Sequence, residues 1–99
     1  MLFIASDHRG YNLKEFLKGY LSQEKIPFKD VGNHKFDPED DYPDFAFKLA
    51  LEVAKNPEKD FGVMACGSGL GMAVAANKVK GIRAGLIMSE WFAEHGREN

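Results

Sequence analysis

The chain has 99 residues, 44% of them hydrophobic, which fits one domain over residues 1–99 with a filled core. Its formal net charge is −2, and its 13 basic and 15 acidic residues are mixed along the chain. This pattern predicts no nucleic-acid partner, since such proteins cluster Lys and Arg. No apolar stretch is as long as a membrane span, and the N-terminus lacks signal-peptide features. The single cysteine excludes an intramolecular disulfide and favours a cytoplasmic protein.

The first half of the chain alternates between strand-like and helix-like segments. Residues 2–5 form a short apolar run that predicts a central strand, and the apolar spacing over residues 11–24 predicts an amphipathic helix. Residues 26–31 alternate loosely and predict a second strand, which a polar loop over residues 32–41 follows. A proline and acidic residues at its start then predict a helix over residues 43–55.

Three polar side chains, Asp7, His8 and Arg9, directly follow the first predicted strand. In open α/β sheets, ligands bind at the carboxyl ends of the strands. An aspartate can accept hydrogen bonds from sugar hydroxyls, and a histidine or arginine can bind a phosphate. The alternative is that Asp7 caps the following helix while the other two side chains are solvated.

The polar loop carries an acidic run that could suggest a metal site. Its members do not have the spacing of a calcium-binding loop, which needs a glycine at position six and a glutamate at position twelve. We therefore interpret the run as a solvated loop and helix cap, and His34 as a solvated side chain. The acidic residues are Asp37, Glu39, Asp40 and Asp41.

The second half of the chain contains a strand, a glycine-rich turn and a helix. Residues 61–65 predict a buried parallel strand, and the helix after the turn is expected to reach about Val79. Residues 82–88 predict a fourth strand, and residues 91–97 predict a short last helix. The regular alternation predicts an α/β fold in which helices cover both faces of a four-stranded parallel sheet.

The glycine-rich turn is the main candidate site. Cys66 and Ser68 alternate with Gly67, Gly69 and Gly71, so a ligand can approach the bare backbone closely. A strand–turn–helix layout directs backbone N–H groups at an anion, and a thiol and a hydroxyl beside them are candidates for proton transfer. The turn matches neither the dinucleotide-binding motif nor the P-loop. The simpler alternative is a tight turn whose small residues allow close packing.

Two further polar side chains have open roles. Tyr42 stands just before the helix over residues 43–55 and either packs or reaches the ligand-binding edge. Asn77 lies on a largely apolar helix and either faces solvent or braces a neighbouring loop.

The sequence resembles the ribose-5-phosphate isomerase B family, which includes the allose- and galactose-6-phosphate isomerases. The matching segments, in family order, are residues 4–10, 41–44, 66–72, 75–78 and 81–84. The resemblance implies a Rossmann-like three-layer α/β/α sandwich that forms a homodimer or homotetramer. It also implies interconversion of an aldose phosphate and a ketose phosphate through a cis-enediol, without metal or organic cofactor. The first candidate substrate is ribose 5-phosphate, a sugar of the pentose phosphate pathway.

On this resemblance, Cys66 matches the general base that moves a proton between C1 and C2 of the sugar. Ser68 matches the residue that helps protons move between O1 and O2. Asp7 and His8 match the substrate-binding pair, and Tyr42 matches the aromatic residue beside the sugar. The backbone amides that match the anion hole for the enediolate are those of the turn, including Gly67, Gly69, Leu70 and Gly71. Thiolates are stabilised near helix N-termini, which agrees with the role assigned to the cysteine.

Two features depart from the family pattern. Family members are longer, and their additional C-terminal part carries a fifth strand, a last helix and the arginines that hold the phosphate. The family's ring-opening histidine falls on Asn99 of this chain, so Asn99 is the matching substrate-binding position. His95, one helical turn earlier, is the other candidate. A truncated relative that does not catalyse, or one that needs a second kind of chain, is the alternative.

Other functions also fit parts of the sequence. Galactose 6-phosphate or allose 6-phosphate is the alternative substrate. A nucleotide- or flavin-binding module is the alternative from another class, because the fold hosts many ligands. That class would use Asp30, at the end of the second predicted strand, to bind a ribose, but it gives no role to Cys66 and Ser68.

Overall fold

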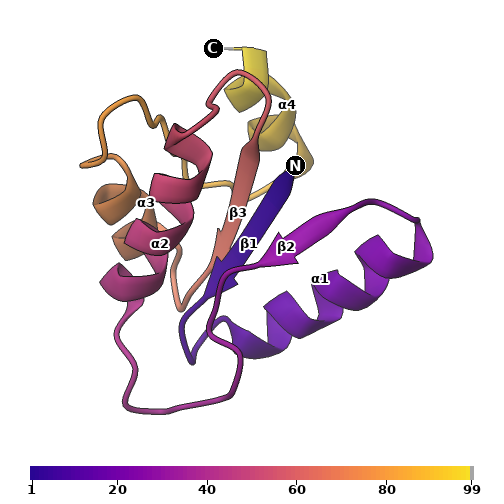
Figure 1. Cartoon of the computed structure of the whole chain (residues 1–99), viewed down its shortest axis with the longest axis vertical. Coiled ribbons are helices and arrows are strands. Elements are labelled where there is room, and N and C mark those ends of the chain that lie inside the picture. Colours follow the sequence, from indigo (N-terminus) through magenta and orange to yellow (C-terminus); the bar gives the residue numbers. More distant parts are fainter. Residues whose placement is uncertain (99) are drawn as a thin grey trace.

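The computed structural model describes the backbone of residues 1–98 and the side chains of residues 1–96, with three strands and four helices in that range (Figure 1). The strands form a parallel sheet in the order β2-β1-β3, so β1 is central. In chain order the elements are β1 (Leu2–Ser6), α1 (Tyr11–Gln23), β2 (Phe28–Asp30), α2 (Tyr42–Ala54), β3 (Phe61–Ala65), α3 (Leu70–Ala76) and α4 (Glu90–Glu98).

The central strand is buried on both of its faces. Phe3 and Ala5 pack with Leu49 of α2, and Ile4 between them is fully buried on the opposite face. Figure 1 shows α1 and α2 on opposite sides of the sheet, with α3 beside α2. This arrangement confirms the predicted α/β/α layers and explains the continuous apolar run of the first strand. None of the helices described is both long and apolar enough to cross a bilayer.

The prediction of a fourth strand over residues 82–88 is wrong. This segment makes no sheet pairing, and β3 is an edge strand of the described sheet. The backbone of Ala84 bonds instead to the side-chain amide of Asn77, which donates to its carbonyl and accepts from its N–H, both at 2.8 Å. Of the two roles left open for Asn77, the structure therefore shows the bracing of a neighbouring loop. The segment is apolar enough for a strand, but a side chain outside the sheet takes both backbone hydrogen bonds of Ala84.

The turn after β1 packs directly against the end of β3. A Cβ atom added at Gly10 would lie 2.1 Å from the Ala65 carbonyl oxygen, so only glycine allows this approach. The Asp7 N–H also donates to the same carbonyl at 3.4 Å. As a result, the residues after β1 and those after β3 share one end of the sheet.

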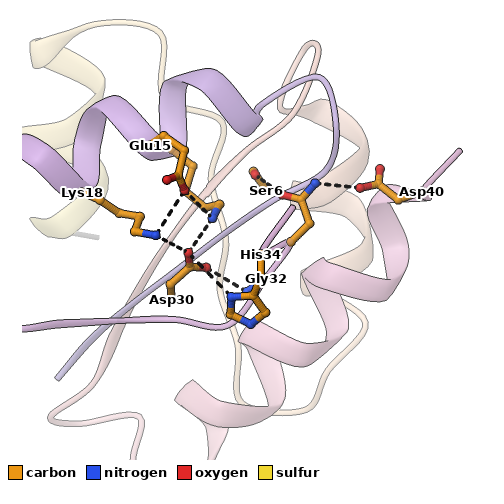
Figure 2. Close-up of polar contacts among 9 residues, drawn as sticks. Ser6, Glu15, Lys18, Asp30, Gly32, His34 and Asp40 are labelled. Carbon is orange, nitrogen blue, oxygen red and sulfur yellow. Dashed lines mark hydrogen bonds and ion pairs between the residues drawn. The ribbon is translucent and has the colours of Figure 1, made fainter. Parts of the chain in front are cut away.

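A cluster of charged side chains joins α1 to the end of β2 (Figure 2). Lys14 is only 1% exposed, and its ammonium group donates to Asp30 Oδ2 at 2.6 Å and to Glu15 Oε2 at 3.1 Å. Lys18 reaches the same two carboxylates, at 2.9 Å to Asp30 and 3.2 Å to Glu15. Hydrogen bonding to Asp30 is the main cause of the raised pKa of Lys18. We refer to these four residues as the α1–β2 ion cluster.

Replacement of Gly19 by alanine is expected to stabilise the protein. Gly19 lies inside α1, and a Cβ atom there would have open space around it. Alanine loses less backbone entropy in a helix, so the free energy of unfolding should rise by about 0.5–1 kcal/mol. Urea denaturation measures the change, and Gly85→Ala, in a non-helical segment with equally open space, is the control.

Candidate active site

A cavity of about 350 Å³ opens where the turns after β1 and β3 meet the start of α2. Seven of the predicted site residues line it: Asp7, His8, Tyr42, Cys66, Gly67, Ser68 and Gly71. Arg9, Asp40 and Asp41 complete the lining. The cavity has the volume of a small-molecule site and lies at the carboxyl ends of the strands, as the position of these residues in the sequence predicted.

The thiol and the hydroxyl of the glycine-rich turn are held by the next residues. The Gly69 N–H donates to Cys66 Sγ at 3.0 Å, and the Leu70 N–H donates to Ser68 Oγ at 3.2 Å. Gly69 has φ +82°, a conformation that an L side chain rarely adopts. These bonds fix both side chains beside the cavity, and the first places a donor where negative charge on the sulfur would form.

Other amides of the turn have no protein acceptor. Within the described chain, the N–H groups of Gly67, Ser68 and Gly71 donate to no protein atom. All three residues line the cavity, and Gly71 lies in the first turn of α3, where helix N–H groups lack intrahelical partners. These amides are available to a ligand oxyanion.

Two glycines of the turn make room for cavity side chains. A Cβ atom at Gly67 would lie 2.9 Å from Cδ of Arg9, so the arginine side chain lies directly on the bare backbone. A Cβ atom at Gly71 would lie 2.7 Å from two ring carbons of Tyr42. Tyr42 is therefore placed at the cavity by contact with α3, which supports the ligand-edge alternative for this residue.

The variant Gly71→Ala is expected to displace the Tyr42 ring with little loss of stability, because an aromatic side chain at 38% exposure can move. If Tyr42 contacts the substrate, KM should rise several-fold, by about 1 kcal/mol of binding free energy. Steady-state kinetics and a thermal melt measure the two effects. An unchanged KM would show that the position of this ring does not matter for binding.

Asp7 supports the turn before α1 and also reaches the cavity, although the N-cap residue of α1 is Gly10. The Asp7 side chain is buried, and Oδ1 accepts a hydrogen bond from the Gly10 N–H at 3.0 Å, which stabilises the turn before α1. Asp7 also lines the cavity, and no group of the described chain donates a hydrogen bond to its second oxygen. One carboxylate oxygen thus fixes the turn while the other is free for a ligand.

The interpretation of Asp40 as a solvated loop residue is wrong. Its Oδ1 accepts from the His8 N–H and pairs with His8 Nδ1, both at 2.8 Å, and its side chain is 8% exposed. Because β1 and β2 are neighbours, the loop that leaves β2 passes the end of β1. That adjacency was the available signal, and it predicts contact between this loop and the residues after the first strand. His34, by contrast, is exposed as expected.

Some predicted residues lie elsewhere. Gly69 and Leu70 do not line the cavity, and their amides donate to Cys66 and Ser68. His95 does not line it either; its ring stacks on Trp91 in α4, which Figure 1 shows at the opposite end of the sheet. Asn99 lies outside the described residues.

The cavity and its surroundings also bear on the alternatives. Asp30 does not line the cavity, and its oxygens accept from Lys14, Lys18 and the Gly32 N–H, so it is not free to bind a nucleotide ribose. No set of three metal-ligating side chains is grouped to hold a metal ion in the part of the chain described. A wider depression of about 570 Å³ is lined by residues of α2 and by Lys55 just after it, and none of the predicted site residues lines it.

Comparison with known proteins shows the family of this chain. The family described as Ribose/Galactose Isomerase matches residues 2–99. The chain belongs to this family. A probable ribose-5-phosphate isomerase B from Mycoplasma genitalium is 47% identical over 98 residues, and ribose-5-P isomerase B from Listeria innocua is 44% identical over 97.

Solved structures of the ribose/galactose isomerase family show the same fold. Ribose-5-phosphate isomerase B from Mycoplasma genitalium with bound ribulose-5-phosphate gives a TM-score of 0.92 at 48% identity, over 97% of this chain and 63% of that chain. The enzyme from Clostridium thermocellum gives 0.90 at 40% identity, over 98% and 64% of the two chains. The present chain spans about 64% of the length of the curated relatives.

Proposed function

We propose that the protein is an aldose–ketose isomerase of phosphorylated sugars that interconverts ribose 5-phosphate and ribulose 5-phosphate. The observation that carries the proposal is the gathering of a thiol, a hydroxyl and three unpaired backbone amides around one cavity of about 350 Å³. Membership in a family whose relatives bear this activity in their names supports it, as does the relative described with bound ribulose-5-phosphate.

The proposed reaction uses the thiolate of Cys66 as the base. It removes the proton from C2 of the open-chain aldose, and the electron pair moves to form the C1–C2 double bond while negative charge develops on O1. The unpaired amides of Gly67 and Gly71 would stabilise this enediolate oxygen. Ser68 would pass the hydroxyl proton from O2 to O1, and the thiol would then return its proton to C1 to give the ketose.

The phosphate end of the substrate needs positive charge. His8 and Arg9 are the basic side chains among the lining residues, and the Arg9 side chain lies against the Gly67 backbone. We therefore assign the phosphate to these two residues, and the sugar hydroxyls to Asp7 and Tyr42. On the family resemblance, we further propose that the protein assembles as a homodimer or homotetramer.

The test is conversion of ribose 5-phosphate to ribulose 5-phosphate by the purified protein, followed by absorbance or NMR. Galactose 6-phosphate and allose 6-phosphate serve as competing substrates in the same assay. Exchange of the C1 or C2 proton with deuterated water would be expected, because the proton passes through an ionisable thiol. The proposal would be overturned if the protein isomerised none of the three sugars. Sedimentation in the same buffer measures whether the protein is a dimer or a tetramer.

A further inference from the structure

The His8 ring is held by one carboxylate. Asp40 Oδ1 lies 2.8 Å from both the backbone N and the ring Nδ1 of His8. The ring edge also meets Phe36, with 6.4 Å between ring centroids and 77° between the planes. Two contacts to the same oxygen fix the backbone and the side chain of His8 together, so the ring has little freedom to rotate.

Asp40 is in turn held by a chain of hydrogen bonds from buried polar side chains (Figure 2). Asn33 Nδ2 donates to Asp40 Oδ2 at 2.8 Å, and Ser6 Oγ donates to Asn33 Oδ1 at 2.9 Å. Ser6 is fully buried and Asn33 is 5% exposed, and the Asn33 N–H also donates to the Ser6 carbonyl at 3.0 Å. The last residue of the central strand thus positions the carboxylate. A loop side chain that merely met solvent would need no such support.

This arrangement decides which nitrogen of His8 carries a proton. An ionised carboxylate has no proton to donate, so in the contact between Asp40 Oδ1 and His8 Nδ1 the nitrogen must be the donor. Nδ1 therefore carries a proton. Among the described residues no protein group bonds to Nε2, and His8 lines the cavity. Nε2 is therefore the nitrogen that is open to a ligand. The charged groups that share the cavity with it are Asp7, Arg9, Asp40 and Asp41.

We propose that Asp40 is a positioning residue for the phosphate group of the substrate, an inference that rests on the proposed function. Asp40 fixes the ring and the Nδ1 proton of His8, and its negative charge stabilises the imidazolium whose Nε2–H donates to the phosphate. The phosphate and Asp40 then lie on either side of one cationic ring. Charge-assisted hydrogen bonds of this kind are stronger than neutral ones.

The first test measures the ring itself, by ¹⁵N NMR of His8 in the protein. The side chain of free neutral histidine favours the proton on Nε2, whereas neutral His8 is expected to carry it on Nδ1 because of the carboxylate. Titration with inorganic phosphate should then protonate Nε2 as well. An Nε2-protonated neutral ring in the wild type, or phosphate binding that leaves the His8 signals unchanged, would overturn the proposal.

The second test uses Asp40→Asn, which keeps an oxygen for Nδ1 but removes the charge. KM for ribose 5-phosphate and the dissociation constant of inorganic phosphate should each rise about tenfold, with kcat changed less than about twofold. The matched control is Asp37→Asn, the same change on an exposed residue of the same loop that does not line the cavity. Equal KM values for the two variants, or a fall in kcat and melting temperature without a rise in KM, would contradict the positioning role.

These readouts separate the two proposals. If the wild type isomerises no sugar phosphate, the proposed function fails, but the tautomer and the phosphate titration still decide what Asp40 does. If the wild type is active and Asp40→Asn binds phosphate as tightly as the wild type, the inference about Asp40 fails alone.

Discussion

Replacement of Cys66 by alanine is expected to lower the rate of sugar-phosphate isomerisation by about a thousandfold, within the range that a positioned general base contributes. That loss corresponds to about 4 kcal/mol of transition-state stabilisation. KM should change little, because the methyl group leaves the amides of Gly67 and Gly71 and the side chains of Asp7 and His8 in place. Steady-state kinetics at saturating substrate measure the effect.

The single cysteine makes a second measurement specific. Cys66 is partly exposed at the cavity, so iodoacetamide should inactivate the wild type, and substrate should slow the modification. The control is a circular dichroism spectrum of the alanine variant. It should match the wild type, because the substitution removes one hydrogen bond, from the Gly69 N–H to the sulfur, and only part of the packing of this side chain against Ala46, Met72 and Ala75. Turnover close to that of the wild type, in the variant or in the alkylated protein, would remove Cys66 from the mechanism.

Local sequence signals were sufficient for most of the site. The residues after β1 and β3 could be placed together because parallel strands deliver their carboxyl ends to one edge of the sheet. The structure explains why three of these positions are glycine. At Gly10, Gly67 and Gly71 a Cβ atom would lie closer than 3.0 Å to backbone or side-chain atoms. The glycine-rich turn could be recognised from neighbouring residues alone, although the atoms that Gly10, Gly67 and Gly71 make room for belong to segments far away in the chain.

Asp40 could not be identified in the same way, because its role depends on His8, which is 32 positions away in the chain. An acidic loop residue has no local signature that separates solvation from a bond to a histidine. The order β2-β1-β3 was needed to bring the loop after β2 past the end of β1. Long-range contacts of this kind follow from topology, and topology was inferred only as far as parallel strands with helices on both faces.

The prediction of a fourth strand was wrong for a related reason. Residues 82–88 have the apolar content of a strand, but pairing also needs free backbone groups, and Ala84 gives both of its groups to Asn77. The sequence showed Asn77 as a polar residue on an apolar helix and left its partner open. The hydrophobic pattern of a sequence indicates which side chains can be buried. It does not indicate where two segments lie relative to each other, and that placement decides whether a side chain takes the backbone hydrogen bonds that a strand would need.

Replacement of Asp30, in the α1–β2 ion cluster, by asparagine is expected to destabilise the protein by about 3 kcal/mol, the cost of breaking a buried ion pair by removing one partner. The asparagine can still accept from the Gly32 N–H through its oxygen, but its amide nitrogen would then face the ammonium group of Lys14. Lys14 is 1% exposed, so its charge would be left buried with only the partly exposed Glu15 as a partner. Urea denaturation at neutral pH measures the loss.

The hydrogen bonds of Asp30 also make the stability of the protein depend on pH. Burial raises the pKa of Asp30, but hydrogen bonds from Lys14 and Lys18 outweigh it and hold the pKa below its ordinary value of 3.8. Stability from this carboxylate is therefore complete above the unfolded value and lost as the pH falls through the lower folded value. The stability difference between wild type and Asp30→Asn should be constant near neutral pH and shrink below about pH 4.

The double variant Lys14→Met/Asp30→Asn separates the ion pair from the packing around it. With both charges removed and the volume of the lysine stem filled by methionine, the double variant should recover most of the stability that Asp30→Asn alone loses. A matched surface pair, Glu52 and Lys55 at 3.2 Å, should show almost no such coupling, because both side chains reach solvent. If the double variant were as unstable as the single one, the unpaired charge of Lys14 would not be the cause of the loss, and the ion pair would not account for the expected cost.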